Sequence, residues 1–143
     1  MASFIKRFYE AKKYNLKTVT CWGSGSPLRE FMHVDDLGDA AVFALENWDP
    51  DSENAPKMSN GDKCYFLNVG TGMDISIKDL AHKIARKVDY SGEILWDKNK
   101  PDGTPKKQLD ITKIRSIGWE PKISLEEGIR KTLKSFQKDN FKA

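Results

Sequence analysis

The sequence predicts a small mixed α/β domain that occupies the whole chain, residues 1–143. Segments with apolar residues at helical spacing alternate with short segments rich in β-branched and aromatic residues. Glycine- and proline-containing turns separate these segments, and no internal repeat or low-complexity tract interrupts them. A chain of this length suffices for one average domain with a modest core.

The first half of the chain contains two helical and two strand-like segments before a long polar stretch. Each apolar segment ends at a turn residue or an acidic residue suited to capping a helix. The polar stretch contains two prolines and a glycine, which indicates a solvated loop insertion. The expected elements are a helix over 3–14 ended by Asn15, strands over 18–22 and 31–34, a helix from Asp35 or Asp36 to about Asn47 with Leu37, Ala41 and Leu45 on its apolar face, and a loop over 49–63.

The second half continues the alternation and carries two helix-start signals. Ser76 followed by Asp79 forms a capping box, and Ser124 precedes the last apolar periodic segment. The expected elements are a strand over 64–69, a turn at Gly70-Thr71-Gly72, a helix over 77–88, a strand over 93–96, a loop over 100–107, a short helix over 110–117 closed by Gly118, and a helix to about residue 138.

Composition excludes several classes of protein. Twenty-four basic residues face 21 acidic ones, giving a net charge of +3, and such a mixed surface argues against nucleic-acid binding. No run approaches the roughly 18 apolar residues of a membrane span. Cys21 and Cys64 are isolated, which indicates reduced thiols in a cytoplasmic protein and no metal site.

Residues 22–36 (WGSGSPLREFMHVDD) are the most informative stretch. An exposed Trp22 can stack on a nucleotide base, and Arg29 at the end of the following loop can bind two phosphate oxygens. The alternative is a turn that leads into a buried strand, and these residues alone do not decide between the two.

The loop over 100–107 (KPDGTPKK) is a second candidate for ligand binding. Its prolines and glycine make a rigid bend from which lysines suited to diphosphate and a carboxylate suited to sugar hydroxyls project. Gly70-Thr71-Gly72 lacks the third glycine of a dinucleotide loop and the Lys-Ser/Thr of a P-loop, so it favours a tight turn. Residues alone identify no catalytic group, because His33 and His82 are interpreted as structural and no Tyr-x-x-x-Lys pair occurs.

Four motifs, in this order, resemble the C-terminal portion of the GDP-L-fucose synthases, within the extended short-chain dehydrogenase/reductase group. They are WGSGSPLREFMHVDD, NVGTG, KPDGTPKK and GWEP. The resemblance covers essentially the whole chain. It implies an NADPH-dependent epimerase and reductase of GDP-4-keto-6-deoxy-mannose whose cofactor loop and catalytic residues lie in an N-terminal Rossmann half that this chain lacks. The chain alone is then expected to be inactive, with no catalytic residue and no cofactor of its own.

What the resemblance implies for the site is substrate binding. The residues that match the family's substrate-binding positions are Arg7, Trp22, Arg29, Asp102 and Lys107. Trp22 and Arg29 would contact the GDP moiety, and Lys107 would contact it with Asp102 in support. Lys6, beside Arg7, is interpreted as solvated, and Asn68 and Asp35 as residues that hold a turn and cap a helix.

The resemblance also implies a surface without its partner. Residues 30–48 would pack on the missing Rossmann domain, so Leu37, Ala41 and Leu45 are expected to be exposed or to drive formation of a homodimer. The expected ligand is a GDP-sugar. The alternatives are a portion of another nucleotide-sugar epimerase or dehydratase, and a free-standing nucleotide-binding module.

Overall fold

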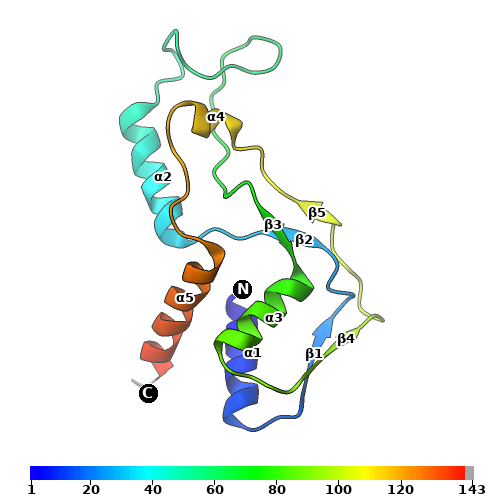
Figure 1. Ribbon diagram of the computed structural model, residues 1–143. Coiled ribbons are helices and arrows are strands. Elements are labelled where there is room, and N and C mark those ends of the chain that lie inside the picture. Colours follow the sequence, from blue (N-terminus) through cyan, green and yellow to red (C-terminus); the bar gives the residue numbers. More distant parts are fainter. Residues whose placement is uncertain (141–143) are drawn as a thin grey trace.

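The computed structural model describes residues 1–140, in which five helices and two small sheets form a mixed α/β fold (Figure 1). The predicted fold class is therefore confirmed. The elements in chain order are α1 (Ala2–Lys13), β1 (Thr18–Trp22), β2 (Leu28–Glu30), α2 (Val34–Asn47), β3 (Asp74–Ser76), α3 (Ile77–Lys87), β4 (Glu93–Asp97), β5 (Lys106–Lys107), α4 (Thr112–Ser116) and α5 (Leu125–Asn140).

The main core lies where α1, α3 and α5 pack together beside the parallel pair β1–β4 (Figure 1). Phe8 of α1 and Leu80 and Ile84 of α3 are fully buried there, and Ile129 of α5 joins them. These positions repeat at helical spacing, so the amphipathic patterns of the three helices predicted the core correctly.

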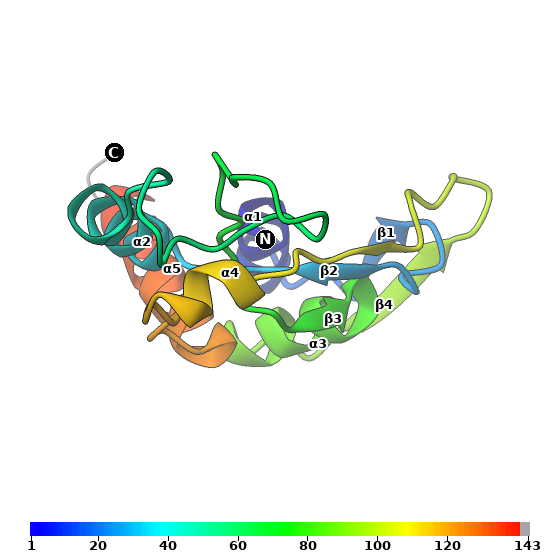
Figure 2. The ribbon, with the colours of Figure 1, turned by 90° about the horizontal axis from the view of Figure 1, so that it is seen from above.

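A second, smaller core joins α2 to α4 and to the segment that follows α4. Ala40, Ile114 and Trp119 are buried in it, and the Trp119 indole donates to Asp39 Oδ2 at 2.9 Å. Figure 2 shows α2 and α5 at one end of the molecule and the β1–β4 pair toward the other. The loop over 49–63 projects from the end of α2, as its polar composition predicted (Figure 1).

Two predicted strands are wrong in position. The structure has β2 at Leu28–Glu30 where residues 31–34 were expected, because these three residues pair with β3 and the first two of them also pair with β5. Residues 64–69 form no strand: Tyr65 and Phe66 are 66% and 52% exposed, and the Cys64 thiol donates locally to Phe66 O. The antiparallel neighbour of β2 is instead β3, which follows residues 64–69 in the chain.

The ends of the helices test the capping predictions. Ser76 Oγ accepts from Asp79 N at 2.9 Å and donates to its carboxylate, which confirms Ser76 as the predicted cap of α3 with Asp79 as its acidic partner. For α2 the prediction of Asp35 or Asp36 as cap is wrong, because His33 Nδ1 accepts from Asp35 N at 3.2 Å. Asp36 is turned inward, and its carboxylate bonds to a distant part of the chain.

The apolar face of α2 is largely exposed. Leu37 is 50% exposed and Leu45 is 87% exposed, and Ala41 is exposed as well, whereas Ala40 is buried. The exposure expected for Leu37, Ala41 and Leu45 is confirmed. Among the helices of residues 1–140, none has the length and apolar character that crossing a bilayer requires.

Candidate functional site

Arg29 and Lys107 lie side by side in the three-stranded sheet β3–β2–β5. Strand β5 pairs with β2 in parallel, and its register places Lys107 opposite Arg29. Residues opposite each other in a ladder present their side chains to the same face, and both line one hollow of about 550 Å³. No ion pair among residues 1–140 neutralises either charge, so together they form a cationic site suited to an anion.

Trp22 stands at the carboxyl end of β1 with 70% of its surface exposed. The Lys100 ammonium lies 5.4 Å from the centroid of its ring, a cation–π contact that orients the indole. A large exposed aromatic ring at a strand end is available for stacking on a base. The prediction that Trp22 is exposed to a ligand therefore has the geometry that it requires.

The turn after Trp22 needs its glycines. Gly23 and Gly25 have φ of +77° and +75°, a backbone conformation that favours glycine. A Cβ on Gly25 would also lie 2.7 Å from ring atoms of Trp96, which packs against the turn. These constraints hold the turn that connects Trp22 to Arg29 in one shape.

Asp102 holds the 100–107 loop against this turn. Its Oδ1 accepts from Ser24 N at 2.9 Å and its Oδ2 from Ser24 Oγ at 2.6 Å. The carboxylate that the sequence suggested for sugar hydroxyls is thus engaged by the protein itself. Gly103, next in the chain, comes close enough to Arg29 that an added Cβ would lie 3.0 Å from Nη2. The loop therefore lies beside both Trp22 and Arg29.

We expect Ser24→Ala to raise the pKa of Asp102. The side-chain and then the backbone hydrogen bond from Ser24 hold this pKa below its ordinary value of 3.8. Because the pKa is lowered in the folded protein, the stabilisation from this contact is present above the ordinary pKa and is lost as the pH falls through the lowered one. A carbon-13 NMR titration of the carboxyl groups measures the change.

Asp110 provides an internal control for this titration. Its pKa is lowered in the same way, by hydrogen bonds from Thr112, and Ser24→Ala leaves those bonds in place. An Asp102 titration that is unchanged in Ser24→Ala would contradict the assigned contact.

Arg7 lies apart from the hollow of Arg29 and Lys107. Its Nη1 donates to Thr20 O at 3.2 Å and lies 3.9 Å from Cys21 Sγ, so it is held against β1. Burial raises the pKa of the Cys21 thiol, and the hydrogen bond and charge of Arg7 partly oppose this. Its neighbour Lys6 is exposed and lies 3.9 Å from Glu10, in keeping with a solvated residue.

Glu30 is a residue that the sequence interpretation missed. Its Oε1 accepts from Thr71 N and from Gly72 N, the latter at 2.6 Å, and its Oε2 accepts from Leu109 N at 3.0 Å. The amide groups of the Gly70–Gly72 turn are therefore engaged by a carboxylate of the protein. This turn does not fit a cofactor phosphate, and the prediction of a tight, closely packed turn is confirmed.

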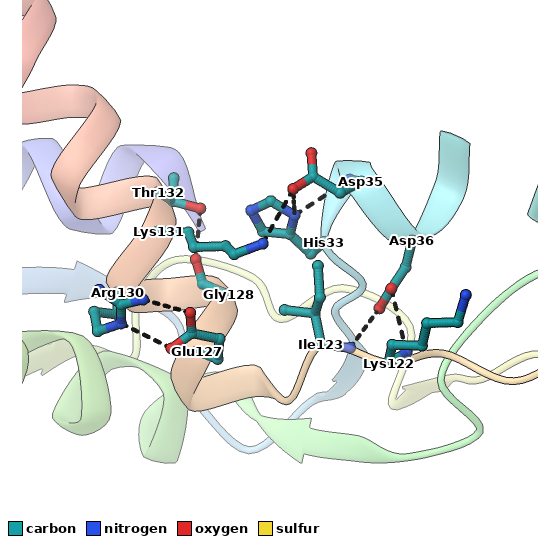
Figure 3. Close-up of polar contacts among 10 residues, drawn as sticks. All are labelled: His33, Asp35, Asp36, Lys122, Ile123, Glu127, Gly128, Arg130, Lys131 and Thr132. Carbon is teal, nitrogen blue, oxygen red and sulfur yellow. Dashed lines mark hydrogen bonds and ion pairs between the residues drawn. The ribbon is translucent and has the colours of Figure 1, made fainter. Parts of the chain in front are cut away.

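A polar cluster at the start of α2 and α5 is structural (Figure 3). Asp36, 2% exposed, accepts from Lys122 N and Ile123 N at 3.2 and 3.0 Å, which fastens the segment before α5 to α2. His33 caps α2 and lies 3.4 Å from Asp35 Oδ2, which pairs with Lys131. His33 also borders a mostly apolar hollow of about 420 Å³ beside the amino ends of α1 and α5.

Asn68 and His82 lie outside the hollow of Arg29 and Lys107. Asn68 Nδ2 donates to Asp110 O at 3.1 Å, so it ties its turn to the segment before α4, as expected of a residue that holds a turn. His82 is exposed on α3. Within residues 1–140, His, Cys, Asp and Glu side chains nowhere gather in a group of three or more that would suit a metal ion.

Comparisons with known proteins show which chains this one is similar to. Residues 1–57 match the family described as "NAD dependent epimerase/dehydratase family". A probable GDP-L-fucose synthase 1 of Oryza sativa subsp. japonica is 42% identical over 134 residues, and the GDP-L-fucose synthase of Escherichia coli K12 is 41% identical over 146 residues. The chain is a homologue of the GDP-L-fucose synthases. The resemblance drawn from its motifs is confirmed.

These relatives are much longer than the region they share with the chain. The alignments cover 94% and 98% of this chain but 37% and 43% of the two GDP-L-fucose synthases. A solved GDP-mannoheptose C4 reductase from Campylobacter jejuni, with NADP bound, is 32% identical with a TM-score of 0.76. The aligned region covers 96% of this chain and 44% of the reductase. The chain thus shares its fold with part of an NADP-binding GDP-sugar reductase.

Proposed function

We propose that this chain is the GDP-sugar-binding portion of a GDP-L-fucose synthase, a GDP-4-keto-6-deoxy-mannose 3,5-epimerase and 4-reductase. The observation that carries the proposal is the cationic pair Arg29–Lys107 in the adjacent strands β2 and β5, with the exposed indole of Trp22 at the end of β1 in the other sheet. The choice of guanine as the base and of the keto-sugar as the sugar of this ligand rests on homology to GDP-L-fucose synthases.

Each of the proposed binding residues has a distinct physical role. The planar guanidinium of Arg29 can bind two diphosphate oxygens at once, whereas Lys107 contributes a compact charge. Trp22 stacks on the guanine. Asp102 supports the site by holding its loop to Ser24. Arg7, held against β1 by its bond to Thr20 O, would contact the ligand outside the hollow of Arg29 and Lys107.

The reaction itself belongs in this proposal to a longer parent chain. NADPH bound to its remaining part would supply the hydride for reduction at C4. Binding energy gathered on the GDP moiety would orient the keto-sugar toward that cofactor. The chain alone holds the substrate and carries out no hydride transfer.

We further propose that residues 30–48 pack on the dinucleotide-binding domain of that parent. The exposed Leu37, Ala41 and Leu45 of α2 are an apolar face of the kind that docks on another domain. Formation of a homodimer through the same face is the alternative, and light scattering of the isolated chain distinguishes the two. Two free, buried cysteines fit a cytoplasmic protein.

We expect the 143-residue chain to bind GDP at least about tenfold more tightly than UDP or dTDP, because a purine stacks on an indole with more surface than a pyrimidine. Titration calorimetry with the three nucleotides measures the affinities. Trp22→Ala provides the matched control, since it removes the stacking surface and should bring the GDP affinity close to that for UDP.

The outcomes separate the three candidate functions. Preference for UDP or dTDP would favour another nucleotide-sugar epimerase or dehydratase. Equal affinity for all three would favour a general nucleotide-binding module. A chain that binds none of them at millimolar concentration would contradict binding by the chain alone.

A further inference from the structure

A single carboxylate connects three segments that surround the cationic pair. Glu30 lies in β2 directly after Arg29, and its Oε1 receives the amides of Thr71 and Gly72. Its Oε2 receives the amide of Leu109, two residues after Lys107. Thr71 Oγ1 adds a further hydrogen bond at 3.1 Å. One side chain therefore joins β2, the Gly70–Gly72 turn and the segment that follows β5.

The position of Lys107 has few other supports. Strand β5 consists of two exposed lysines, so no side chain of the strand packs into either core. Before it, Leu28 N donates to Pro105 O at 2.8 Å. Within it, Lys106 pairs with Asp74 at 3.1 Å. After it, the nearest contacts along the chain are the bond from Gln108 Nε2 to Gly72 O at 2.5 Å and the Glu30–Leu109 bond, followed by the bond from Asn68 Nδ2 to Asp110 O. Glu30 thus contacts this segment directly through Leu109, and it also holds the Gly70–Gly72 turn to which Gln108 bonds.

The same bonds keep Glu30 from neutralising its neighbours. A carboxylate in the hollow of Arg29 and Lys107 would ordinarily pair with a cation and weaken an anion site. Among the described residues, however, Glu30 forms no ion pair, and its oxygens are directed at backbone amides and a hydroxyl. Both positive charges thus remain available for a ligand.

We propose that Glu30 is the positioning residue of the anion site, which holds Lys107 beside Arg29 for the diphosphate of a nucleotide. This inference rests on the proposed function for the identity of the ligand. Glu30 itself does not touch the ligand and acts through the segment after β5 and through the Gly70–Gly72 turn.

Two substitutions disturb this contact from opposite sides. Glu30→Gln keeps the shape but leaves one acceptor oxygen, so it can serve either the turn or Leu109 and not both. Gly70→Ala keeps the carboxylate but displaces it, because a Cβ there would lie 2.9 Å from Glu30 Cδ and closer still to Oε1. Gly38→Ala is the matched control, since a Cβ at Gly38 meets no atom within 4 Å.

The first measurement is amide hydrogen exchange by NMR, with no ligand present. We expect Glu30→Gln and Gly70→Ala to exchange faster at Gly72 and Leu109 than the unaltered chain, with helix α3 unchanged. Gly38→Ala should match the unaltered chain at these amides. Unchanged exchange at Leu109 in both variants would overturn the inference, because Glu30 would not be holding this segment.

The second measurement is the affinity for GDP. We expect a loss of about tenfold in either variant, in line with losing hydrogen bonds to a charged group. Lys107→Ala should weaken binding in the unaltered chain and have little further effect in Glu30→Gln, because Lys107 is already displaced there. Full, additive losses would overturn the positioning role. If the unaltered chain binds no GDP, the proposed function fails, and hydrogen exchange alone decides whether Glu30 holds the segment.

Discussion

Arg29→Ala is expected to weaken GDP binding about a hundredfold, because it removes two charge-assisted hydrogen bonds to the diphosphate. The guanidinium is half-buried, and its Nη1 donates to Leu28 O at 2.6 Å, which leaves its remaining donors for a ligand. Gly103 lies close to the guanidinium, since an added Cβ there would be 3.0 Å from Nη2. Little rotational freedom is therefore lost when the ligand binds, and titration calorimetry with GDP measures the effect.

Arg29→Lys tests the geometry of this interaction separately from its charge. Lysine retains the positive charge but presents no planar pair of donors, so we expect a loss of about tenfold. Arg86→Ala at the exposed end of α3 is the control and should bind GDP like the unaltered chain. Equal GDP affinity of Arg29→Ala and the control, with both variants folded by circular dichroism, would remove Arg29 from the site.

Strands were predicted well where each had a long partner. Strand β1 matches its predicted residues, and β4 differs from the prediction by one residue, because five consecutive pairs join the two. The strand β2 has only three residues, and its neighbours lie far along the chain. Local composition therefore predicted a strand at the more apolar residues 31–34. In the structure these residues lead from β2 into the start of α2. The apolar run 64–69 does not form a strand, because no other strand of the described residues pairs with it.

The candidate site could be predicted as residue types but not as an arrangement. An aromatic residue, a glycine turn and an arginine can be recognised in the sequence, and Trp22 is exposed as its role requires. That Lys107 lies opposite Arg29 depends on the register of a two-residue strand, which no local pattern encodes. The bond between Asp102 and Ser24 likewise joins distant loops.

Glu30 shows the limit of interpretation by residue type. In the sequence Glu30 lies between an arginine and a phenylalanine, and no local pattern distinguishes it from an ordinary solvated carboxylate. Its role follows from the close approach of Gly70, where a side chain would displace the carboxylate. Gly70, the first glycine of the NVGTG motif, was the available signal, since a glycine after an apolar run marks a close approach as well as a turn.

Asp36→Ala is expected to lower the free energy of unfolding by about 3 kcal/mol, because it leaves two backbone N–H groups without their charged acceptor. Asp36 is 2% exposed and bonds to Lys122 N and Ile123 N (Figure 3). These bonds attach the segment between Trp119 and α5 to the first turn of α2. Their loss affects both cores, since Trp119 belongs to the smaller one and α5 to the main one. Urea denaturation followed by circular dichroism measures the change.

Asp35→Ala is the matched control, because it makes the same change one residue earlier on an exposed side chain. Asp35 is 61% exposed and pairs with Lys131 at 3.2 Å, so its loss should cost less than about 1 kcal/mol. Asp36→Asn should be intermediate, since its amide oxygen can accept one N–H while its NH₂ group faces the other. Equal losses in Asp35→Ala and Asp36→Ala would show that the buried carboxylate does not hold α2 and α5 together.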